Sequence, residues 1–252
     1  MINKDFIIIG AGIVGLVLGL KLKKKFPNKT ILILDKEPDS ISHGTGRNSG
    51  VIHSGIYYPP SSLRAKYCVS GSKQLKSYVK SKKLWIDECG KILLPTNKQS
   101  LKSIEILLDR AKISGIEAKK INSKEILELE KNANPIFDIG IHVPFTSVVN
   151  PKEVAASIKS DILKLGVEVI YNSEVTKINT EKGSVFSNGN EYEAKMIINS
   201  AGLQADTIAK ISKFKSEYSF LPFKGKYWKL KKNISMSKLL YPVPNLHLPF
   251  LG

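Results

Sequence analysis

The residues with the clearest chemical potential stand near the start of the chain, where three glycines follow the spacing Gly10-x-Gly12-x-x-Gly15. In this spacing the first glycine permits a tight turn, the second lets the backbone approach a pyrophosphate, and the third lets helix and strand pack closely. A following helix offers free N–H groups and its positive dipole end to the phosphates. Asp35 stands where a carboxylate can accept both ribose hydroxyls of an adenosine. These residues predict dinucleotide binding. The spacing does not separate NAD from FAD, and the acid disfavours NADP.

Two further segments carry residues suited to a nucleotide or substrate site. The stretch from Ser42 to Pro60 is rich in glycine, serine and tyrosine and is long for a loop; long ordered loops in compact domains are often functional. Far along the chain, Ser200-Ala201-Gly202-Leu203 joins an apolar run to a helix expected to begin at Gln204. Such a junction is the natural place for the fold to return to the nucleotide, and a simple glycine turn is the alternative.

The elements that position these residues follow from the hydrophobic pattern. The β-branched run from Asp5 to Ile9 predicts a strand buried on both faces, an apolar helix then extends to about Lys25, and Thr30 to Leu34 predicts a second strand. This order favours a bound dinucleotide over a turn without a ligand. Further helices are expected over 62–82, 100–114, 123–126 and 151–165. Further strands are expected over 90–95, 139–144, 167–170, 175–178, 183–186 and 195–199. From Ser216 the pattern is aromatic and strand-like, at 220–223, 227–230 and 239–241.

The charge pattern argues against nucleic acid as a partner. The chain of 252 residues has a formal net charge of +17, but Arg47, Arg64 and Arg110 are the only arginines among its 39 basic residues. Proteins that read nucleic-acid grooves rely on arginine for bidentate base contacts, whereas scattered lysine is typical of a solvated surface.

The cysteines and the N-terminal run bear on location. Cys68 and Cys89 form no CxxC pair and no metal-ligand spacing, so we interpret them as reduced thiols in the core of a cytoplasmic protein. Positive charge follows the apolar run from Phe6 to Leu20, whereas a secretory signal has its positive charge before the apolar run. The run is also too short and too rich in glycine to span a bilayer. We expect a cytoplasmic protein, with peripheral association at the inner face of a membrane left open.

The whole chain resembles, in order, the L-2-hydroxyglutarate oxidases and dehydrogenases, FAD enzymes of the D-amino-acid-oxidase-like superfamily. The specific motifs are the block from Asn48 to Tyr58, which Thr45-Gly46 precedes, and Tyr241-Pro242-x-Pro244. The remaining matching blocks are Cys89-Gly90-Lys91, Gly140 to Val149, Ser200-Ala201-Gly202 with Asp206, Pro222-Phe223-x-Gly225-x-Tyr227, and Pro249-Phe250-Leu251-Gly252.

The resemblance implies an α/β fold, in which a Rossmann-type FAD-binding domain carries an inserted α+β substrate domain with a mixed or antiparallel sheet. We expect a discontinuous FAD-binding domain over residues 1–85 and 145–215, and an incomplete substrate domain over 86–144 and 216–252. FAD is the implied cofactor, and no metal is expected. The residues expected to bind FAD are Gly10, Gly12, Ile13, Val14, Gly15, Asp35, Lys36, Thr45, Asn48, Ser49, Gly50, Val51, Val175, Ala201 and Gly202.

The implied reaction is oxidation of L-2-hydroxyglutarate, or a close 2-hydroxy acid, to the 2-oxo acid by hydride transfer to the flavin. His53 is the candidate general base, with a structural hydrogen bond or a flavin contact as an equal alternative. Tyr57 and Tyr58 are candidates for lining the substrate pocket, although aromatic packing explains them as well. Lys224 or Arg47 is the candidate partner of the substrate carboxylates. The electron acceptor is open between oxygen, a quinone and an electron-transfer protein.

Departures from the family pattern keep two alternatives open. Arg47 stands where histidine is usual, Lys224 where arginine is usual, and Lys226 where an acid is usual, so a related enzyme acting on glycerol 3-phosphate or malate is one alternative. The Tyr-Pro-x-Pro block argues against it. Members of the family continue beyond the last matching block, so the chain resembles an N-terminal fragment with the C-terminal part missing. An inactive truncated chain that holds FAD weakly is therefore the other alternative.

Overall fold

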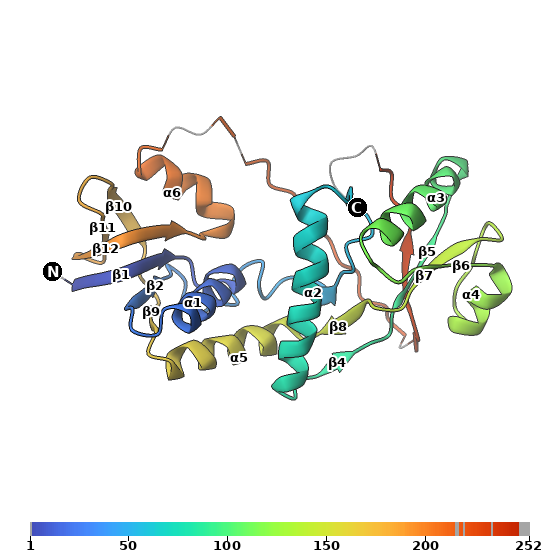
Figure 1. Ribbon diagram of the computed structural model, residues 1–252, viewed down its shortest axis with the longest axis horizontal. Coiled ribbons are helices and arrows are strands. Elements are labelled where there is room, and N and C mark those ends of the chain that lie inside the picture. The colour runs from blue at the N-terminus through green and yellow to red at the C-terminus, as the bar shows by residue number, and fades with distance from the viewer. Residues whose placement is uncertain (1, 215–216, 219, 233, 247–252) are drawn as a thin grey trace. The chain divides into compact units, whose positions relative to one another are not determined.

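The chain divides, by the contacts among its residues, into two compact units (Figure 1). The structure is a computed structural model that describes residues 2–214, 217–218, 220–232 and 234–246. One unit comprises Met1–Asn48 and Pro151–Tyr227, and the other comprises Ser49–Asn150 and Trp228–Gly252. The expected domains differ from these units mainly over residues 49–85, because this stretch makes its contacts within the second unit. The division by function into FAD and substrate domains is a separate matter and stays a prediction.

The first unit is built on a six-stranded sheet in the order β10-β11-β12-β1-β2-β9. Strands β12, β1, β2 and β9 run parallel, and β10 and β11 extend the sheet in antiparallel fashion. In this register Ile7 lies between Leu32 and Ile197. The strands are β1 (Ile2–Ile9), β2 (Ile31–Leu34), β9 (Glu168–Ile170), β10 (Val175–Asn179), β11 (Ser184–Ser187) and β12 (Asn190–Asn199). The parallel half confirms the Rossmann-type expectation.

Both faces of this sheet are covered, which explains why β1 and β2 read as continuous apolar runs. Helix α1 (Ile13–Lys25) packs against α5 (Pro151–Lys164), and a Cβ on Gly19 of α1 would lie 3.0 Å from Ile33 and 3.8 Å from Ile8. Side chains alternate along a strand, so Ile7 and Ile9 face the other side. There they pack in a core cluster with Ile208 of α6 (Ala205–Ile211), which the short 3₁₀ helix η1 (Gly202–Gln204) precedes.

The second unit contains two small sheets. One has four strands in the order β13-β5-β7-β6, and the other has three in the order β3-β8-β4. Only the pair β13–β5 is parallel within them. The strands are β3 (Val51–Ile52), β4 (Ile86–Asp87), β5 (Lys91–Leu94), β6 (Lys119–Ile121), β7 (Gly140–Val143), β8 (Ser147–Val149) and β13 (Leu239–Pro242). This mixed arrangement confirms the expected α+β character.

Three helices accompany these sheets, and polar residues define where they begin. In α2 (Leu63–Ser81) the Ser62 side chain accepts a hydrogen bond from the Ala65 amide at 3.2 Å. Helices α3 (Lys98–Ile113) and α4 (Ser123–Leu129) begin with reciprocal capping boxes at Asn97 and Asn122. Each cap satisfies N–H groups that have no partner inside the helix. The apolar faces of α3 and α4 then pack in separate clusters, one around Leu93 and the other around Ile92, because neighbouring residues of β5 face opposite sides.

The expected strands over 220–223 and 227–230 are wrong. Residues 220–230 have no regular structure and are exposed, and among the described residues of the aromatic region only Leu239–Pro242 forms a strand. Aromatic and β-branched residues favour strands only where another strand supplies hydrogen bonds and a face to pack on. Within the described residues, Tyr241 has such a neighbour in β5, whereas Phe223 lies outside any strand. The Pro249–Gly252 block lies outside the described residues.

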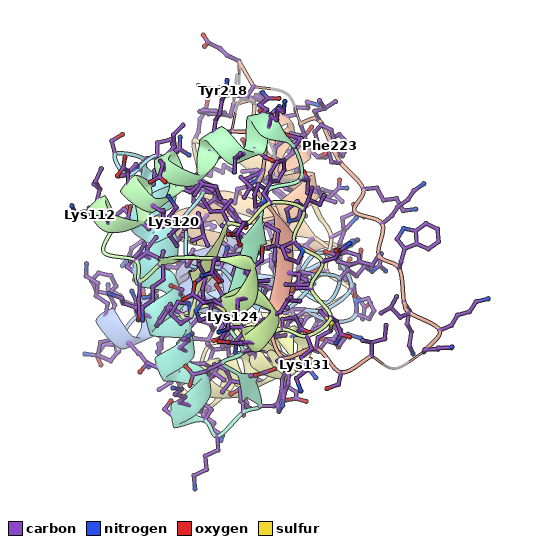
Figure 2. All side chains as sticks on the ribbon, turned by 90° about the vertical axis from the view of Figure 1, so that its right-hand side faces the viewer. Lys112, Lys120, Lys124, Lys131, Tyr218 and Phe223 are labelled. Carbon is purple, nitrogen blue, oxygen red and sulfur yellow. The ribbon has the colours of Figure 1, made fainter. Side chains whose placement is uncertain are left out.

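The large positive charge resides mainly on solvated lysines. Figure 2 labels Lys112, Lys120, Lys124 and Lys131, whose side chains project from α3, β6, α4 and the turn after it. All four are exposed, and Lys120 pairs with Glu105 at 2.6 Å.

In the described part of the chain, no helix is both long and apolar enough to cross a membrane.

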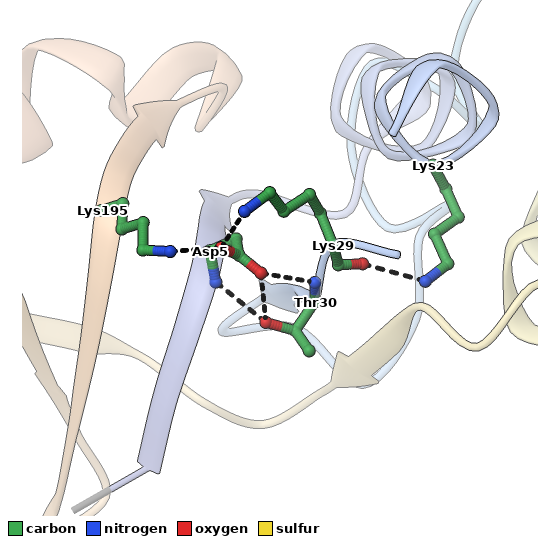
Figure 3. Close-up of polar contacts among 5 residues, drawn as sticks. All are labelled: Asp5, Lys23, Lys29, Thr30 and Lys195. Carbon is green, nitrogen blue, oxygen red and sulfur yellow. Dashed lines mark hydrogen bonds and ion pairs between the residues drawn. The ribbon is translucent and has the colours of Figure 1, made fainter. Parts of the chain in front are cut away.

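Asp5, within β1, organises the part of the first sheet at which β2 begins (Figure 3). One carboxylate oxygen accepts the Thr30 amide at 2.9 Å and the Thr30 hydroxyl at 3.1 Å. The other accepts the ammonium groups of Lys195 at 2.9 Å and Lys29 at 3.0 Å. The Thr30 amide, followed by these lysines, lowers the pKa of Asp5 well below its usual range. One carboxylate therefore ties β1 to the start of β2 and to β12.

Replacing Asp5 by Asn is expected to lower the melting temperature at pH 7. A carboxyl group with a lowered native pKa stabilises the fold fully above its unfolded pKa of about 4, and that contribution fades as the pH falls through the native value. Thermal melts followed by circular dichroism from pH 7 to pH 2.5 should show the gap between Asp5→Asn and wild type closing below about pH 4. Asp109→Asn, at an exposed position of α3, is the control. A gap that stays constant with pH would contradict this role.

Candidate functional site

The glycine turn after β1 is held by backbone contacts that leave no room for side chains. Gly10 has φ +104°, and a Cβ there would lie 2.5 Å from the Ser200 carbonyl oxygen. A Cβ on Gly15 would lie 1.9 Å from the Gly10 carbonyl oxygen. The Ser200 hydroxyl in turn lies 3.0 Å from the Ile9 carbonyl oxygen and 3.1 Å from that of Gly10, to which it donates. The fold itself therefore requires glycine at positions 10 and 15.

Gly12 differs from these two glycines. A Cβ at this position would meet one atom within 4 Å, the Thr45 hydroxyl oxygen at 3.3 Å. That oxygen accepts the Ile13 amide, the first of α1, at 2.9 Å. Since packing among the described residues does not demand glycine at position 12, the bare backbone is suited to a group that approaches from outside the protein. The N-terminus of the 13-residue helix α1 favours an anion there.

Asp35 fastens this turn to the end of β2. Its two carboxylate oxygens accept the Ala11 amide at 2.6 Å and the Glu37 amide at 2.8 Å. Each carboxylate oxygen has capacity for a further hydrogen bond, so both backbone contacts are compatible with the expected binding of ribose hydroxyls. The next acid, Glu37, pairs with His43 at 2.8 Å, which lowers the pKa of Glu37. Asp35 thus has a structural task in addition to its expected one.

The structure gathers part of the expected cofactor set in the first unit. Gly10 to Gly15, Asp35, Thr45 and the Ser200–Gly202 junction lie together through the contacts above. Val14 and Lys36 are exposed, and the Val175 side chain packs in the core cluster. Asn48 donates to the carbonyls of Gly44 and Thr45, both at 2.9 Å. The expected cofactor residues Ser49, Gly50 and Val51 belong to the second unit.

The second unit holds a buried cation that the sequence reasoning missed. Lys91, the first residue of β5, has no exposed surface, and its ammonium has no hydrogen-bond partner within the described residues. It lies 4.2 Å from the ring centre of Tyr57 and 5.6 Å from that of Tyr241. Burial lowers the pKa of Lys91 to about 7. The sequence feature that could have indicated a buried cation is a lysine directly before the apolar run Ile92–Leu94. Lys91 enters the sequence-based prediction only as part of the Cys89-Gly90-Lys91 block.

Further unsatisfied polar groups lie on the loop after β3 that carries Tyr57. Nδ1 of His53 and the hydroxyls of Ser54 and Tyr57 are buried without a hydrogen-bond partner in the described part of the chain. The His53 and Tyr241 rings are arranged edge-on, with 6.1 Å between their centres. The Cys68 thiol lies 3.5 Å from the His53 carbonyl oxygen. Buried polar groups in proteins are rarely left unpaired, and such cases mark water, ligand or catalytic positions. We call His53, Ser54, Tyr57 and Lys91 the buried polar cluster.

Burial sets the protonation states in the buried polar cluster. It lowers the pKa of His53 to about 4, with the nearby Lys91 adding to the effect. It raises the pKa of Tyr57 well above the usual range, and that of Cys68 as well. At neutral pH the imidazole, phenol and thiol are therefore uncharged. A neutral imidazole can accept a proton, which the expected role of His53 requires.

The other expected substrate residues lie elsewhere in the fold. Tyr58 is half-buried, directly after Tyr57. Lys224 and Arg47 are exposed and belong to the first unit. Cys68 and Cys89 are free and half-buried, rather than fully in the core as expected. Among the described residues, no group of three or more His, Cys, Asp or Glu side chains could hold a metal ion.

Comparisons with known proteins agree with this arrangement. The family described as FAD dependent oxidoreductase matches residues 5–252. L-2-hydroxyglutarate dehydrogenase of Escherichia coli K12 is 36% identical over 98% of this chain and 60% of its own length. The mitochondrial L-2-hydroxyglutarate dehydrogenase of Homo sapiens is 34% identical over 98% of this chain and 57% of its own. The chain thus spans about 60% of the length of the curated relatives it matches.

Solved structures show the same fold at low sequence identity. L-α-glycerophosphate oxidase from Mycoplasma pneumoniae, solved with FAD bound, has a TM-score of 0.80 at 20% identity, over 97% of this chain and 66% of its own. Glycine oxidase from Geobacillus kaustophilus has a TM-score of 0.73 at 17% identity, over 84% of this chain and 59% of its own. These likenesses establish the architecture.

Gly12→Val is expected to abolish FAD retention while the fold survives. The new side chain would occupy the open side of the turn, where its Cβ meets only the Thr45 hydroxyl, which can shift. The protein should therefore purify without flavin absorbance but with native far-ultraviolet circular dichroism. Gly71→Ala, at an exposed position of α2 with open space, is the control and should keep its FAD. A full complement of FAD in Gly12→Val would remove this residue from the cofactor site.

Lys91→Met is expected to stabilise the protein at pH 7 and to flatten its pH dependence. The native pKa of Lys91, about 7, lies below its unfolded value, so the unfolded state binds the extra proton between pH 7 and pH 10. Wild-type stability should therefore rise over that window, by up to about 1.4 kcal/mol per pH unit. Urea unfolding at four pH values measures the slope. Equal slopes in both proteins would show that Lys91 does not lose its proton on folding.

Proposed function

The chain belongs to the family of FAD dependent oxidoreductases, and from this premise we propose that it carries out the FAD-dependent oxidation of L-2-hydroxyglutarate, or a close 2-hydroxy acid, to the 2-oxo acid. FAD is the cofactor of the family. The observation that supports this substrate class best is the likeness along 98% of the chain to proteins named L-2-hydroxyglutarate dehydrogenase. The likeness to L-α-glycerophosphate oxidase, at 20% identity, supports the fold and does not favour glycerol 3-phosphate as substrate.

The glycine turn fits the cofactor. The open side of Gly12 and the N-terminus of α1 are suited to the pyrophosphate, because the backbone can approach it and amide groups can donate to it. Asp35 is placed to accept ribose hydroxyls with the capacity that its two backbone contacts leave. We propose that the Ser200–Gly202 junction, which contacts Gly10, completes the nucleotide end of the site.

The buried polar cluster fits proton handling. Bound FAD supplies the acceptor for the two electrons that leave C2 of the substrate together with its hydrogen. The remaining requirement is that the hydroxyl proton leaves as the carbonyl forms. His53, uncharged at neutral pH, is the proposed acceptor of that proton. Tyr57 and Tyr58 are proposed to line the substrate pocket, and Lys224 remains a proposed substrate contact. Two free cysteines fit a cytoplasmic protein, whether free or peripherally bound at the inner face of a membrane.

L-2-Hydroxyglutarate should bleach the flavin of the FAD-loaded protein under anaerobic conditions, and the D-isomer should not, because only one face of C2 can present its hydrogen. Stopped-flow absorbance measures the rate. His53→Ala should slow the reduction by roughly 10²–10⁴-fold if the imidazole is the base. His142→Gln, at a half-buried histidine of β7, is the matched control and should reduce at the wild-type rate.

Three outcomes would change the proposal. Wild-type reduction rates in His53→Ala would leave His53 as a structural residue. Bleaching by glycerol 3-phosphate or malate, but not by L-2-hydroxyglutarate, would transfer the protein to the alternative substrate class. No bleaching by any of these compounds would overturn the proposed reaction.

A further inference from the structure

The Lys91 amine is buried in the second unit without a hydrogen-bond partner among the described residues. A buried charge normally has a partner of opposite sign, because removing an ion from water is costly. Lys76 shows the ordinary solution in the same unit: it is also buried, lies over the Phe145 ring at 3.6 Å, and pairs with Glu88 at 3.3 Å. Lys91 has aromatic contacts as well, but no carboxylate partner in the described part of the chain.

No group that faces Lys91 among the described residues supplies a negative charge at neutral pH. These groups are His53 and Tyr57 of the loop after β3, Cys68 of α2 and Tyr241 of β13. Burial keeps His53, Tyr57 and Cys68 uncharged, as described above. Arg110 of α3, which donates to the Tyr57 carbonyl, is itself positive. The surroundings of Lys91 therefore lack an anion.

We propose that Lys91 binds a carboxylate of the substrate, and that the buried polar cluster is the part of the site that selects acids. The inference rests on the proposed function and names the residue that gives it its specificity. Charge-assisted hydrogen bonds from an ammonium to a carboxylate are short and strong, and a fully buried one is strengthened further by the low local dielectric. In addition to Lys91, hydrogen-bonding groups for the other substrate oxygens are available on His53, Ser54 and Tyr57. Because Lys91 is enclosed, its four-carbon stem must rotate, or an adjacent ring must move, for the two groups to meet.

Glutarate, which has the two carboxylates but no hydroxyl to oxidise, is the probe. Isothermal titration of the FAD-loaded protein at pH 8, in two buffers of different ionisation enthalpy, measures both affinity and proton exchange. Lys91 is mostly neutral at pH 8 and must be charged to hold the anion, so binding should take up close to one proton. Lys91→Met should bind glutarate roughly 10–100-fold more weakly and without proton uptake. Lys91→Arg should recover part of the affinity, also without proton uptake, because arginine is always charged.

Lys76→Met is the matched control, since it makes the same substitution at a buried lysine that has its own carboxylate. It should keep wild-type affinity for glutarate and wild-type proton uptake. Steady-state kinetics with L-2-hydroxyglutarate give a second readout, in which Lys91→Met should raise KM by a similar factor.

Several results would overturn the role of Lys91. One is glutarate binding to the wild type without proton uptake, which needs no variant to fold. Another is wild-type affinity and KM in Lys91→Met, and a third is a lower kcat at unchanged KM, which would make Lys91 a proton-transfer group. Failure of the proposed function has a different signature: no 2-hydroxy acid bleaches the wild-type flavin, while glutarate binding still reports on Lys91.

Discussion

The contact of backbone on backbone between Gly10 and Gly15 is the constraint on which the nucleotide end of this protein depends. A Cβ at Gly15 would lie 1.9 Å from the Gly10 carbonyl oxygen, so any side chain there would drive α1 away from β1. The same turn accepts the Ser200 hydroxyl, and Asp35 holds it through the Ala11 amide. Strand, helix and the distant Ser200 junction thus meet at one point. With these neighbours fixed, the bare backbone of Gly12 can face outward.

The two units differ in whether their polar groups have hydrogen-bond partners within the protein. Around the glycine turn, the hydrogen-bonding groups of Asp35, Thr45 and Ser200 have partners within the protein. In the buried polar cluster, the ammonium of Lys91 and the Nδ1 of His53 have none in the described part of the chain. The first arrangement fixes a shape for a large cofactor. In the second arrangement the unpaired polar groups destabilise the protein until an anion binds to them. An acid is therefore favoured over a neutral compound.

Local pattern predicted most of this fold. The glycine spacing, the apolar runs of β1 and β2 and the amphipathic helices were all predicted close to their observed bounds, because each is determined by residues near in sequence. The strands expected over 220–230 failed because strand formation depends on a neighbour, which the local pattern does not contain. Lys91 was missed for a related reason. This lysine becomes exceptional only when folding places Tyr57, Cys68 and Tyr241 around it, with no carboxylate partner among the described residues.

The pairing of β1 with β12 has a consequence for the synthesis of the protein. Ile2 pairs with Tyr192 and Ile9 with Asn199, so the first strand made acquires this neighbour only after residues 10–189 have been synthesised. At typical ribosomal speeds, roughly 10–40 s separate the two strands. During that time β1 and β2 can form a parallel pair that exposes one apolar edge, which is open to unwanted association. Most of the second unit, from β3 to β8, is made between these events, and its strand β13 follows β12. The apolar edge of β1 is therefore exposed while the chain is still attached to the ribosome, where chaperones that cover apolar edges act.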